Sequence, residues 1–367
     1  MRIGILSAEL GREDVHENKR LTREIRLKGH RAQVINYRKT VVVTTKNKRI
    51  LYQPDKKGVL RPVKVDAVIP RINEADEQSI SLATLALETV MSSGVYSTAS
   101  PAAIRLAKNK IGSIMALAGT GVPAPRSAAI TGTEAYEVNI DKVLGIVEPN
   151  PARRLIIKTN TGTHGKGVMP ANSRGEARAI VDGFLANNIP VLLQQFIEPT
   201  KKDAYADLRF IVIHGRVVSA MKRVSTRKDE IRANLSLGGM GLPYEADEHE
   251  IALAERAAKA LGLNVAGVDM IPSGKKRVVI EVNTSPGFVI ESVSKVNVAK
   301  KIVQLAISGA RKGTKPKPAD KLVEILTADV RLPKTLPQTR KLPALPASLK
   351  RLKKAGRRAG SKAARAG

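Results

Sequence analysis

The chain has 367 residues, which is enough for two or three domains. It contains no cysteine, which excludes disulfide bonds, thiolate catalysis and Cys-based zinc sites. Hydrophobic residues make up 43% of the chain and aromatic residues only 3%, so the core must be built mainly from aliphatic side chains. No stretch approaches the roughly 20 apolar residues of a membrane span. This composition is compatible with a reducing compartment, and we expect a cytoplasmic protein.

Positive charge is distributed unevenly along the chain. The formal net charge is +30, from 63 Lys and Arg and 33 Asp and Glu residues. Residues 311–367 alone hold 17 basic and 3 acidic residues, with prolines between them. Such a segment cannot bury enough apolar surface to fold by itself, so we expect a disordered basic tail. The tail is either an arm that contacts a polyanion such as RNA, or a solvated extension with no specific partner.

Strands and helices alternate in the first hundred residues. The pattern predicts strands at 2–6, 32–36 and 66–70, a hairpin of 40–45 and 49–53, and helices at 16–28 and 77–93. Gly29 and Gly94 follow the two helices, as is typical of helix ends. This alternation predicts a small α/β domain with a parallel sheet over residues 1–97.

A connector that contains Gly and Pro divides the rest of the chain. Ser100 and Pro101 are suited to begin a helix, which we expect to continue to Ala118. We assign residues 98–125 to this linking helix and its connector. Two subdomains are expected after it, at 126–198 and 199–310. They hold predicted strands at 155–158, 191–196, 208–214, 217–223, 265–271 and 277–282, and helices at 175–187, 248–261 and 296–308.

A strand that ends in Lys158 opens into a loop rich in Gly and Thr, at 159–167. Glycines let backbone N–H groups turn toward an anion, and the Lys158 ammonium can meet phosphate oxygens. The loop has neither the Walker pattern nor the dinucleotide-binding pattern. It therefore indicates either a phosphate site of another kind or a simple turn.

An apolar strand near residue 280 is interrupted by a carboxylate. Glu281 lies among Val and Ile residues, where an unsatisfied carboxylate would be costly to bury. Asn283 is two residues further on and so faces the same side of a strand. Asp269 lies in a similar apolar strand, and the three oxygen-bearing side chains together suit Mg²⁺. The alternative is a buried carboxylate that Arg or backbone N–H groups satisfy.

Several cations and amides lie between these two candidate sites in the sequence. They are Arg209 beside Asp207, Arg223, and Arg232 with Asn234. Arginine binds carboxylates and phosphates through two parallel hydrogen bonds. Each arginine could equally form an ordinary surface salt bridge.

Taken in chain order, these residues resemble the RimK-like ATP-grasp ligases. The most specific matches are 65–72, 265–269 and 281–287, and the resemblance covers about residues 1–308. It implies a mixed α/β fold, in which an N-terminal α/β domain precedes two ATP-grasp subdomains that hold the nucleotide between them. RimK adds glutamate to the C-terminus of ribosomal protein S-six, and close relatives join other amino acids to other carboxylates.

The resemblance also implies a role for each candidate residue. Lys110, Lys158 and the loop residues Thr161, Gly162, Gly165 and Gly167 would bind the ATP phosphates. Gln194, Gln195, Phe196 and Ile197 would hold adenine. Asp269, Glu281 and Asn283 would bind two Mg²⁺ ions, which Mn²⁺ can replace. Arg209, Arg232 and Asn234 would act in catalysis, with Arg71, Arg209 and Asn234 holding substrate carboxylates.

The sequence departs from the family pattern at several positions. Gln195 stands where relatives commonly have Glu, which leaves nucleotide selectivity open. Leu237 and Lys222 also depart from the pattern and could alter the acceptor or the amino acid. The segment 199–206 is longer than usual, and the basic tail lies outside the resemblance.

We therefore expect a homo-oligomeric, ATP- and Mg²⁺-dependent carboxylate–amine ligase. It would add L-glutamate to the C-terminal carboxylate of a ribosomal or other protein through an acyl phosphate. One alternative is a ligase of the same fold with another amino acid or a small-molecule acceptor. Another is an RNA- or ribosome-binding protein on an inactive ATP-grasp scaffold. The intact Lys158, Asp269, Glu281 and Asn283 argue against an inactive scaffold.

Overall fold

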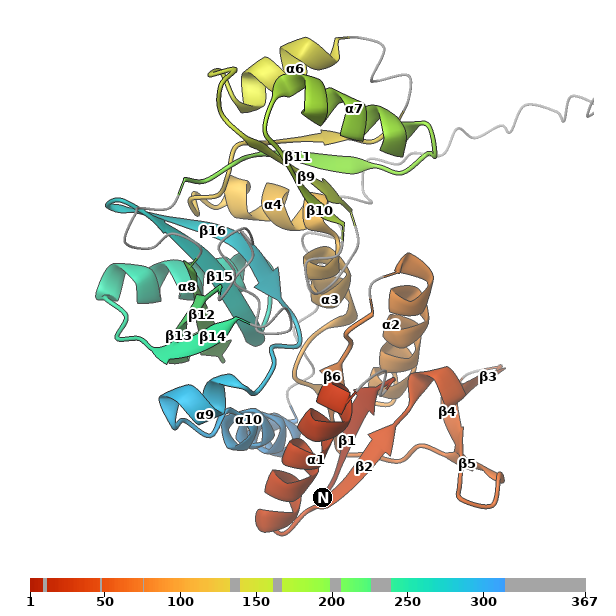
Figure 1. Ribbon diagram of the computed structural model, residues 1–367. Helices are drawn as coiled ribbons and strands as arrows, with labels where there is room; N and C mark the ends of the chain where they lie inside the picture. Colours follow the sequence, from red (N-terminus) through yellow and green to blue (C-terminus); the bar gives the residue numbers. More distant parts are fainter. Residues whose placement is uncertain are drawn as a thin grey trace, which may run out of the picture. The chain divides into compact units, whose positions relative to one another are not determined.

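Figure 1 shows the computed structural model of the chain. The structure describes residues 1–8, 12–46, 48–74, 76–132, 139–160, 167–198, 206–225 and 239–313. All of these belong to one compact unit, Met1–Lys321. Most of the predicted basic tail lies outside the described residues.

The amino-terminal part of the chain forms a parallel sheet with helices packed on it (Figure 1). Its strands lie in the order β2-β1-β6-β7, and each neighbouring pair is parallel. The elements are β1 (Arg2–Ser7), α1 (Arg12–Leu27), β2 (Arg31–Ile35), β6 (Ala67–Arg71), α2 (Glu77–Met91) and β7 (Tyr96–Ser97). All five residues of β6 are buried, as expected for a strand covered on both faces. The predicted α/β domain is confirmed, while the two-residue strand β7 was not predicted.

The predicted hairpin is present and gains a third strand. It consists of β3 (Val41–Thr45), β4 (Lys48–Pro54) and β5 (Leu60–Pro62), after the short 3₁₀ helix η1 (Tyr37–Lys39). Leu51 of β4 is buried in the same apolar cluster as Leu87 of α2. The hairpin is thereby attached to the N-terminal domain.

The predicted linking helix is two helices. α3 (Pro101–Lys108) begins after Ser100, whose side chain accepts a hydrogen bond from the Ala103 N–H as expected. The helix ends at Asn109, because this residue has an extended backbone and its side chain accepts from the Gly112 N–H instead. α4 (Lys110–Gly119) starts there. The single helix predicted from Ser100 to Ala118 is therefore wrong, and the break places Lys108 and Lys110 on either side of a bend.

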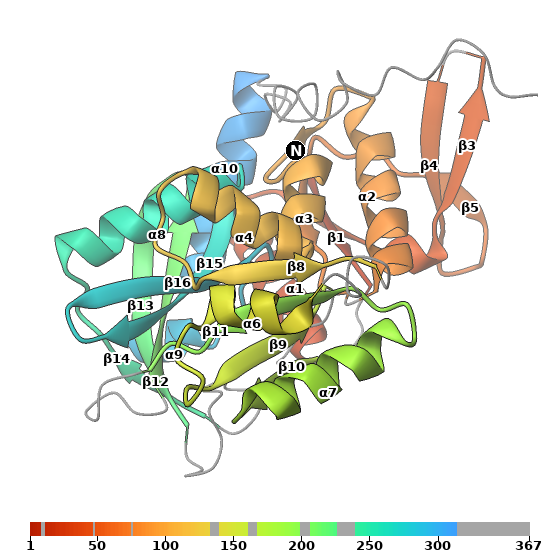
Figure 2. The same cartoon turned by 90° about the horizontal axis from the view of Figure 1, so that it is seen from above.

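An antiparallel sheet with two helices on one face follows (Figure 2). Its order is β10-β9-β11-β8. The elements are β8 (Ser127–Ile130), α6 (Ile140–Val147), β9 (Leu155–Thr159), β10 (Val168–Ala171), α7 (Arg174–Leu185) and β11 (Val191–Gln195). The fully buried Leu144, Ile157 and Val181 pack together between sheet and helices. β8, α6 and β10 were not predicted.

A second antiparallel sheet has five strands, in the order β14-β13-β12-β15-β16. The elements are β12 (Ala206–Ile213), β13 (Arg216–Val224), β14 (Met240–Pro243), α8 (Glu248–Ala260), β15 (Val265–Ser273) and β16 (Lys276–Asn283). Residues of α8 and α4 pack with Phe210 and Val268 on one face of the sheet. The opposite face carries the polar residues described below.

The described chain ends by returning to the N-terminal domain. α9 (Ile290–Ser294), which was not predicted, leads into α10 (Val298–Lys312), which contacts α1, β6 and β7. The predicted helix at 296–308 is thus displaced toward the C-terminus and runs past the boundary expected at residue 310. In the ranges given above, no helix is both long and apolar enough to cross a bilayer.

Candidate active site

Lys158 lies at the end of β9, on the face of its sheet that turns toward β16. It is paired across the strands with Leu192, so the two side chains share a face. Leu192 packs in the apolar cluster that also contains Val279 and Val282 of β16. The lysine therefore points to the region between the two antiparallel sheets.

Asn160, two residues beyond Lys158, holds the start of α4 against the end of β9. Its carbonyl oxygen accepts a hydrogen bond from the Lys110 N–H at 3.0 Å, and its side-chain oxygen accepts from the Ile111 N–H at 3.2 Å. These contacts bring Lys110 close to Lys158 although 48 positions separate them in the sequence.

A third lysine, Lys108, joins this group. The Glu281 carboxylate is the main favourable charge for Lys108, Lys110 and Lys158 alike. Burial nevertheless lowers the pKa of Lys108 and of Lys158 to about 8. It also lowers the pKa of Lys110. Three ammonium groups around one carboxylate leave an excess of positive charge, which suits a polyanion such as a nucleotide phosphate chain.

Lys108 was missed by the sequence reasoning. The Lys-Asn-Lys spacing of 108–110 was visible, but on a continuous helix residues two apart face different directions. The break at Asn109 changes the helix direction between the two lysines, and both are within the electrostatic reach of Glu281.

The lowered pKa values predict that nucleotide affinity falls at alkaline pH. Phosphate monoesters lose their second proton near about pH 6, so the nucleotide changes little in charge above about pH 7.5. Lys108 and Lys158 instead lose their protons as the pH rises through about 8. We expect ATP affinity to fall by at least about tenfold between about pH 7 and pH 9.5, measured by calorimetry. Lys158→Arg should reduce this fall, because a guanidinium stays protonated. Equal affinity across this range would contradict the role of the lysines.

Asp269, Glu281 and Asn283 share one face of the five-stranded sheet. Asp269 is directly opposite Glu281, and Asn283 is opposite Gly267, two residues from Asp269. Opposite residues on antiparallel strands have Cβ atoms about 4.5–5.5 Å apart. The three predicted ligands are therefore neighbours, as expected.

A β-bulge at Ile280 produces this alignment. The register pairs Asp269 with Glu281 but Met270 with Val279, so Ile280 has no partner. The extra residue lets Val279 and Val282 both face the core while Glu281 turns outward. Glu281 is consequently exposed, so the alternative of a buried carboxylate satisfied by Arg or backbone N–H groups is wrong for Glu281.

Asp269, in contrast, is buried and already paired with two arginines. It is 2% exposed. Both of its oxygens accept hydrogen bonds from Arg209, and Oδ2 also lies 3.1 Å from Nη2 of Arg223. Arg223 in turn donates to both oxygens of Asp207, at 2.6 and 2.7 Å. Burial alone would raise the pKa of Asp269, but Arg209 and Arg223 together hold it below its usual value. The two arginines and two carboxylates form a neutral, buried network.

The donor set therefore fits a divalent cation in part. The Glu281 side chain makes no hydrogen bond or ion pair within the described residues. Asn283, two residues further along the strand, is half-buried, and its Nδ2 donates to Asp269 Oδ2 at 3.4 Å. Glu281 and Asn283 supply the hard oxygen atoms that Mg²⁺ prefers. Among the described residues, no three Asp, Glu or His side chains form a group that could hold a metal ion. Asp269 as a third ligand stays a prediction.

The predicted adenine-binding segment is largely engaged in its sheet. Gln194 and Gln195 pair with β9, and the Gln195 N–H donates to the Arg126 carbonyl oxygen at 2.8 Å. The Gln195 side chain donates to Glu148 at 3.0 Å. Phe196 and Ile197 follow the strand, and in the described part of the chain no backbone hydrogen bond occupies them. Free main-chain groups for a base are thus found at Phe196 and Ile197.

Arg71 is not placed as a substrate-binding residue would be. It is 3% exposed and its guanidinium pairs with Glu17 and the Pro286 carbonyl oxygen. The side chain therefore has no exposed face that could bind the substrate carboxylate that the resemblance implied for it. The remaining predicted residues, Thr161, Gly162, Gly165, Arg232 and Asn234, lie outside the described residues. Gly167 is described and its carbonyl oxygen accepts from the Thr159 N–H at 2.9 Å.

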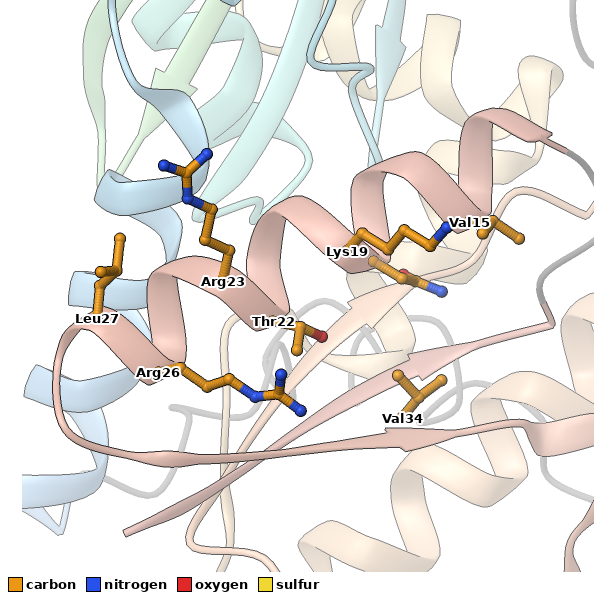
Figure 3. Close-up of a pocket in the computed structure, with 8 residues that line it drawn as sticks. Val15, Lys19, Thr22, Arg23, Arg26, Leu27 and Val34 are labelled. Carbon is orange, nitrogen blue, oxygen red and sulfur yellow. The ribbon is translucent and has the colours of Figure 1, made fainter.

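A hollow of about 470 Å³ lies elsewhere, between α1 and β2 (Figure 3). It is lined by Val15, Asn18, Lys19, Thr22, Arg23, Arg26, Leu27 and Val34. None of the candidate site residues lines it, so the candidate active site is defined by the side chains around Glu281 and not by this hollow.

Comparison with known proteins places the chain in a family. Residues 1–104 match the RimK PreATP-grasp domain and residues 107–306 match the RimK-like ATP-grasp domain. A protein of Thioalkalivibrio sulfidiphilus named probable alpha-L-glutamate ligase is 35% identical over 313 residues, which cover 85% of this chain and 97% of the relative. A relative of the same name from Legionella pneumophila is 34% identical, covering 83% and 94%.

Solved structures show the same fold. A RimK domain ATP-grasp protein from Sphaerobacter thermophilus has a TM-score of 0.60 at 20% identity, covering 84% of this chain and 100% of the other. The ATP-grasp ligase PsnB, solved with a precursor variant, Mg and ADP, has a TM-score of 0.57 at 19% identity, covering 84% and 97%. The chain belongs to the RimK-like ATP-grasp family. The predictions of this family, of the mixed α/β ATP-grasp fold and of a ligase are confirmed.

Proposed function

We propose that this ligase joins L-glutamate to the C-terminal carboxylate of a protein, with ATP as the energy source. The observation that carries the proposal is the grouping of three lysines from two helices and a strand. Asn160 ties the start of α4 to the end of β9, and Lys108, Lys110 and Lys158 all lie within the electrostatic reach of Glu281. Support for glutamate comes from the relatives, which are named alpha-L-glutamate ligases and match over most of their length.

The chemistry follows from the charges around this site. A carboxylate is a poor electrophile until its oxygen attacks the γ-phosphorus of ATP, which releases ADP and leaves an acyl phosphate. The three lysines orient the phosphate chain and offset its charge. The glutamate amine then attacks the acyl carbon, loses a proton, and inorganic phosphate departs as the amide forms.

Magnesium fits this scheme as a bound ion at Glu281 and Asn283, where it would neutralise charge on the phosphoryl oxygens. The number of ions, which we predict to be two, and replacement by Mn²⁺ stay predictions. Arg209 is bound to Asp269 in the buried network and is thereby held in a fixed position. We propose that Arg209 orients the acyl phosphate through the exposed part of its side chain, which is 12% exposed.

The direct test is mass spectrometry of candidate acceptor proteins after incubation with ATP, Mg²⁺ and labelled glutamate. We expect a mass increase on the C-terminal peptide, with one ADP formed for each residue added. ADP formation with another amino acid and none with glutamate would favour the alternative ligase. We also propose that the enzyme is cytoplasmic and homo-oligomeric and that its acceptor is a ribosomal protein.

Truncation of the basic tail distinguishes the proposed ligase from the alternative, an RNA-binding protein on an inactive scaffold. α10 runs to Lys312, so the cut should follow Gly313 and not residue 310. We expect residues 1–313 to form ADP at a rate within about threefold of the full chain, because no described contact of the site involves the tail. A change limited to acceptor recognition would assign the tail to acceptor binding. Loss of ADP formation in a folded truncation would contradict the proposed boundary.

A further inference from the structure

A buried ion pair joins the N-terminal domain to the segment that follows β16. Arg71 lies at the end of β6 and pairs with Glu17 of α1. Arg71 also donates to the Pro286 carbonyl oxygen at 3.0 Å, and its guanidinium lies 4.9 Å from the centre of the Phe288 ring. Glu17 accepts from the Phe288 N–H at 3.1 Å. Both charged side chains are thus bonded to one short loop.

Neighbouring contacts fix the same loop. The Ile72 N–H donates to Ser285 Oγ at 3.1 Å. Phe288 is 3% exposed and packs with Ile3 and Leu21 in the core of the N-terminal domain. The loop 284–288 therefore takes its position from the N-terminal domain.

Two glycines show how closely this loop is packed. A Cβ atom at Gly267 would lie 2.9 Å from the Cβ of Pro286, and one at Gly287 would lie 3.1 Å from Glu17 Oε1. Contacts this short leave little room for the loop to shift. Gly267 is also the residue directly opposite Asn283.

The loop begins immediately after Asn283 and three residues after Glu281. Glu281 sits just beyond a β-bulge and Asn283 ends the strand, so ladder hydrogen bonds hold them less firmly than mid-strand residues. The orientation of the Glu281 and Asn283 side chains therefore depends on the next fixed point along the chain. That fixed point is the loop 284–288, which Glu17 and Arg71 bind.

We propose that Glu17 and Arg71 are positioning residues, which hold Glu281 and Asn283 in the orientation needed to bind a divalent cation together with the nucleotide. This inference rests on the proposed function. It assigns Arg71 to the support of the site instead of to contact with a substrate. Glu17, which the sequence alone did not indicate, thereby becomes a second supporting residue of the site.

A second ion pair between the same segments provides a matched control. Arg20 of α1 donates to Glu291 of α9 at 2.8 Å, three residues beyond Phe288. It links α1 to the same part of the chain but lies further from Asn283. The test variant combines Arg71→Met with Glu17→Gln. The control variant combines Arg20→Met with Glu291→Gln and so removes one positive and one negative charge from its pair, as the test variant does. Removing both charges of the Glu17–Arg71 pair avoids leaving one of them buried without its partner. Arg20 also pairs with the buried Glu24 at 3.2 Å, so the control includes Glu24→Gln as well.

The experiment is ADP binding by calorimetry with and without Mg²⁺, in the absence of amino acid and acceptor. A residue that only held a substrate carboxylate would not affect this measurement. We expect the Glu17/Arg71 double variant to bind ADP with Mg²⁺ at least about tenfold more weakly than wild type, as is typical when second-shell support is lost. Its affinity without Mg²⁺ and both affinities of the Arg20/Glu291 variant should stay within about twofold of wild type. Arg71→Lys, which keeps the charge, should give a smaller loss in the same direction.

Unchanged Mg²⁺–ADP affinity in the Glu17/Arg71 variant would overturn the inference, and so would an equal loss with and without Mg²⁺. Wild-type protein that gains no affinity from Mg²⁺ would overturn the proposed metal-dependent function itself. If the double variant does not fold, Arg71→Lys decides by the same two comparisons. The melting temperature of each variant without ligand reports whether it is folded.

Discussion

Replacing Glu281 by Gln is expected to reduce ADP formation by at least about 100-fold, more than is typical for the loss of a supporting residue. Glu281 is the carboxylate on which three lysines converge, and it makes no hydrogen bond or ion pair within the described residues. Gln keeps the shape but removes the charge that a divalent cation requires. The assay is ADP release with ATP, Mg²⁺, glutamate and acceptor.

The same substitution should leave the free energy of unfolding close to that of wild type. Glu281 is exposed and its carboxylate makes no hydrogen bond or ion pair within the described residues. Its loss removes only longer-range attraction for the three lysines, which we expect to cost less than about 1 kcal/mol. Glu245→Gln, at an exposed carboxylate in the segment before α8, is the control and should alter neither activity nor stability. A fully active Glu281→Gln enzyme would remove Glu281 from the metal site. A large loss of stability would show instead that the residue supports the fold.

Local patterns in the sequence were sufficient to predict most helices and strands. Alternation of strands and helices predicted the parallel N-terminal sheet, and the hairpin of β12 and β13 lies where expected. The elements that were missed are short or lack an apolar period, as for β7 and β14. The missed strands form because a neighbouring strand pairs with them, which their own residues do not encode.

The residue types of the candidate site were visible in the sequence, but the geometry of the site was not. The spacing of Glu281 and Asn283 correctly placed them on one face, yet the bulge at Ile280 was not visible in a run of Val and Ile. The break at Asn109 was also missed, although its capping contact with Gly112 is local. A buried carboxylate satisfied by arginine was one of the two alternatives, and Asp269 fits that alternative. Which alternative holds depends on contacts between residues distant in sequence.

Breaking the buried network around Asp269 is expected to cause a large loss of stability. Arg223→Met would leave Asp207 and Asp269, which are 7% and 2% exposed, with Arg209 as their one remaining arginine in the network. Removing one partner of a buried ion pair typically costs about 3–5 kcal/mol, because an uncompensated charge stays buried. We expect a loss of this size in urea-induced unfolding of Arg223→Met. Arg178→Met should cost less than about 1 kcal/mol, because Arg178 and Asp141 form an exposed pair.

The same measurement tests what holds Asp269 in place. If the arginines fix its carboxylate, adding Asp207→Asn to Arg223→Met should recover part of the lost stability, since two carboxylates would no longer share one guanidinium. An Arg223→Met protein as stable as wild type would show that the network is not needed for folding. Arg209 would still hold both oxygens of Asp269, so the Mg²⁺ affinity of Arg223→Met should stay within about twofold of wild type. A rise in Mg²⁺ affinity would show instead that Arg223 competes with the ion for Asp269 Oδ2.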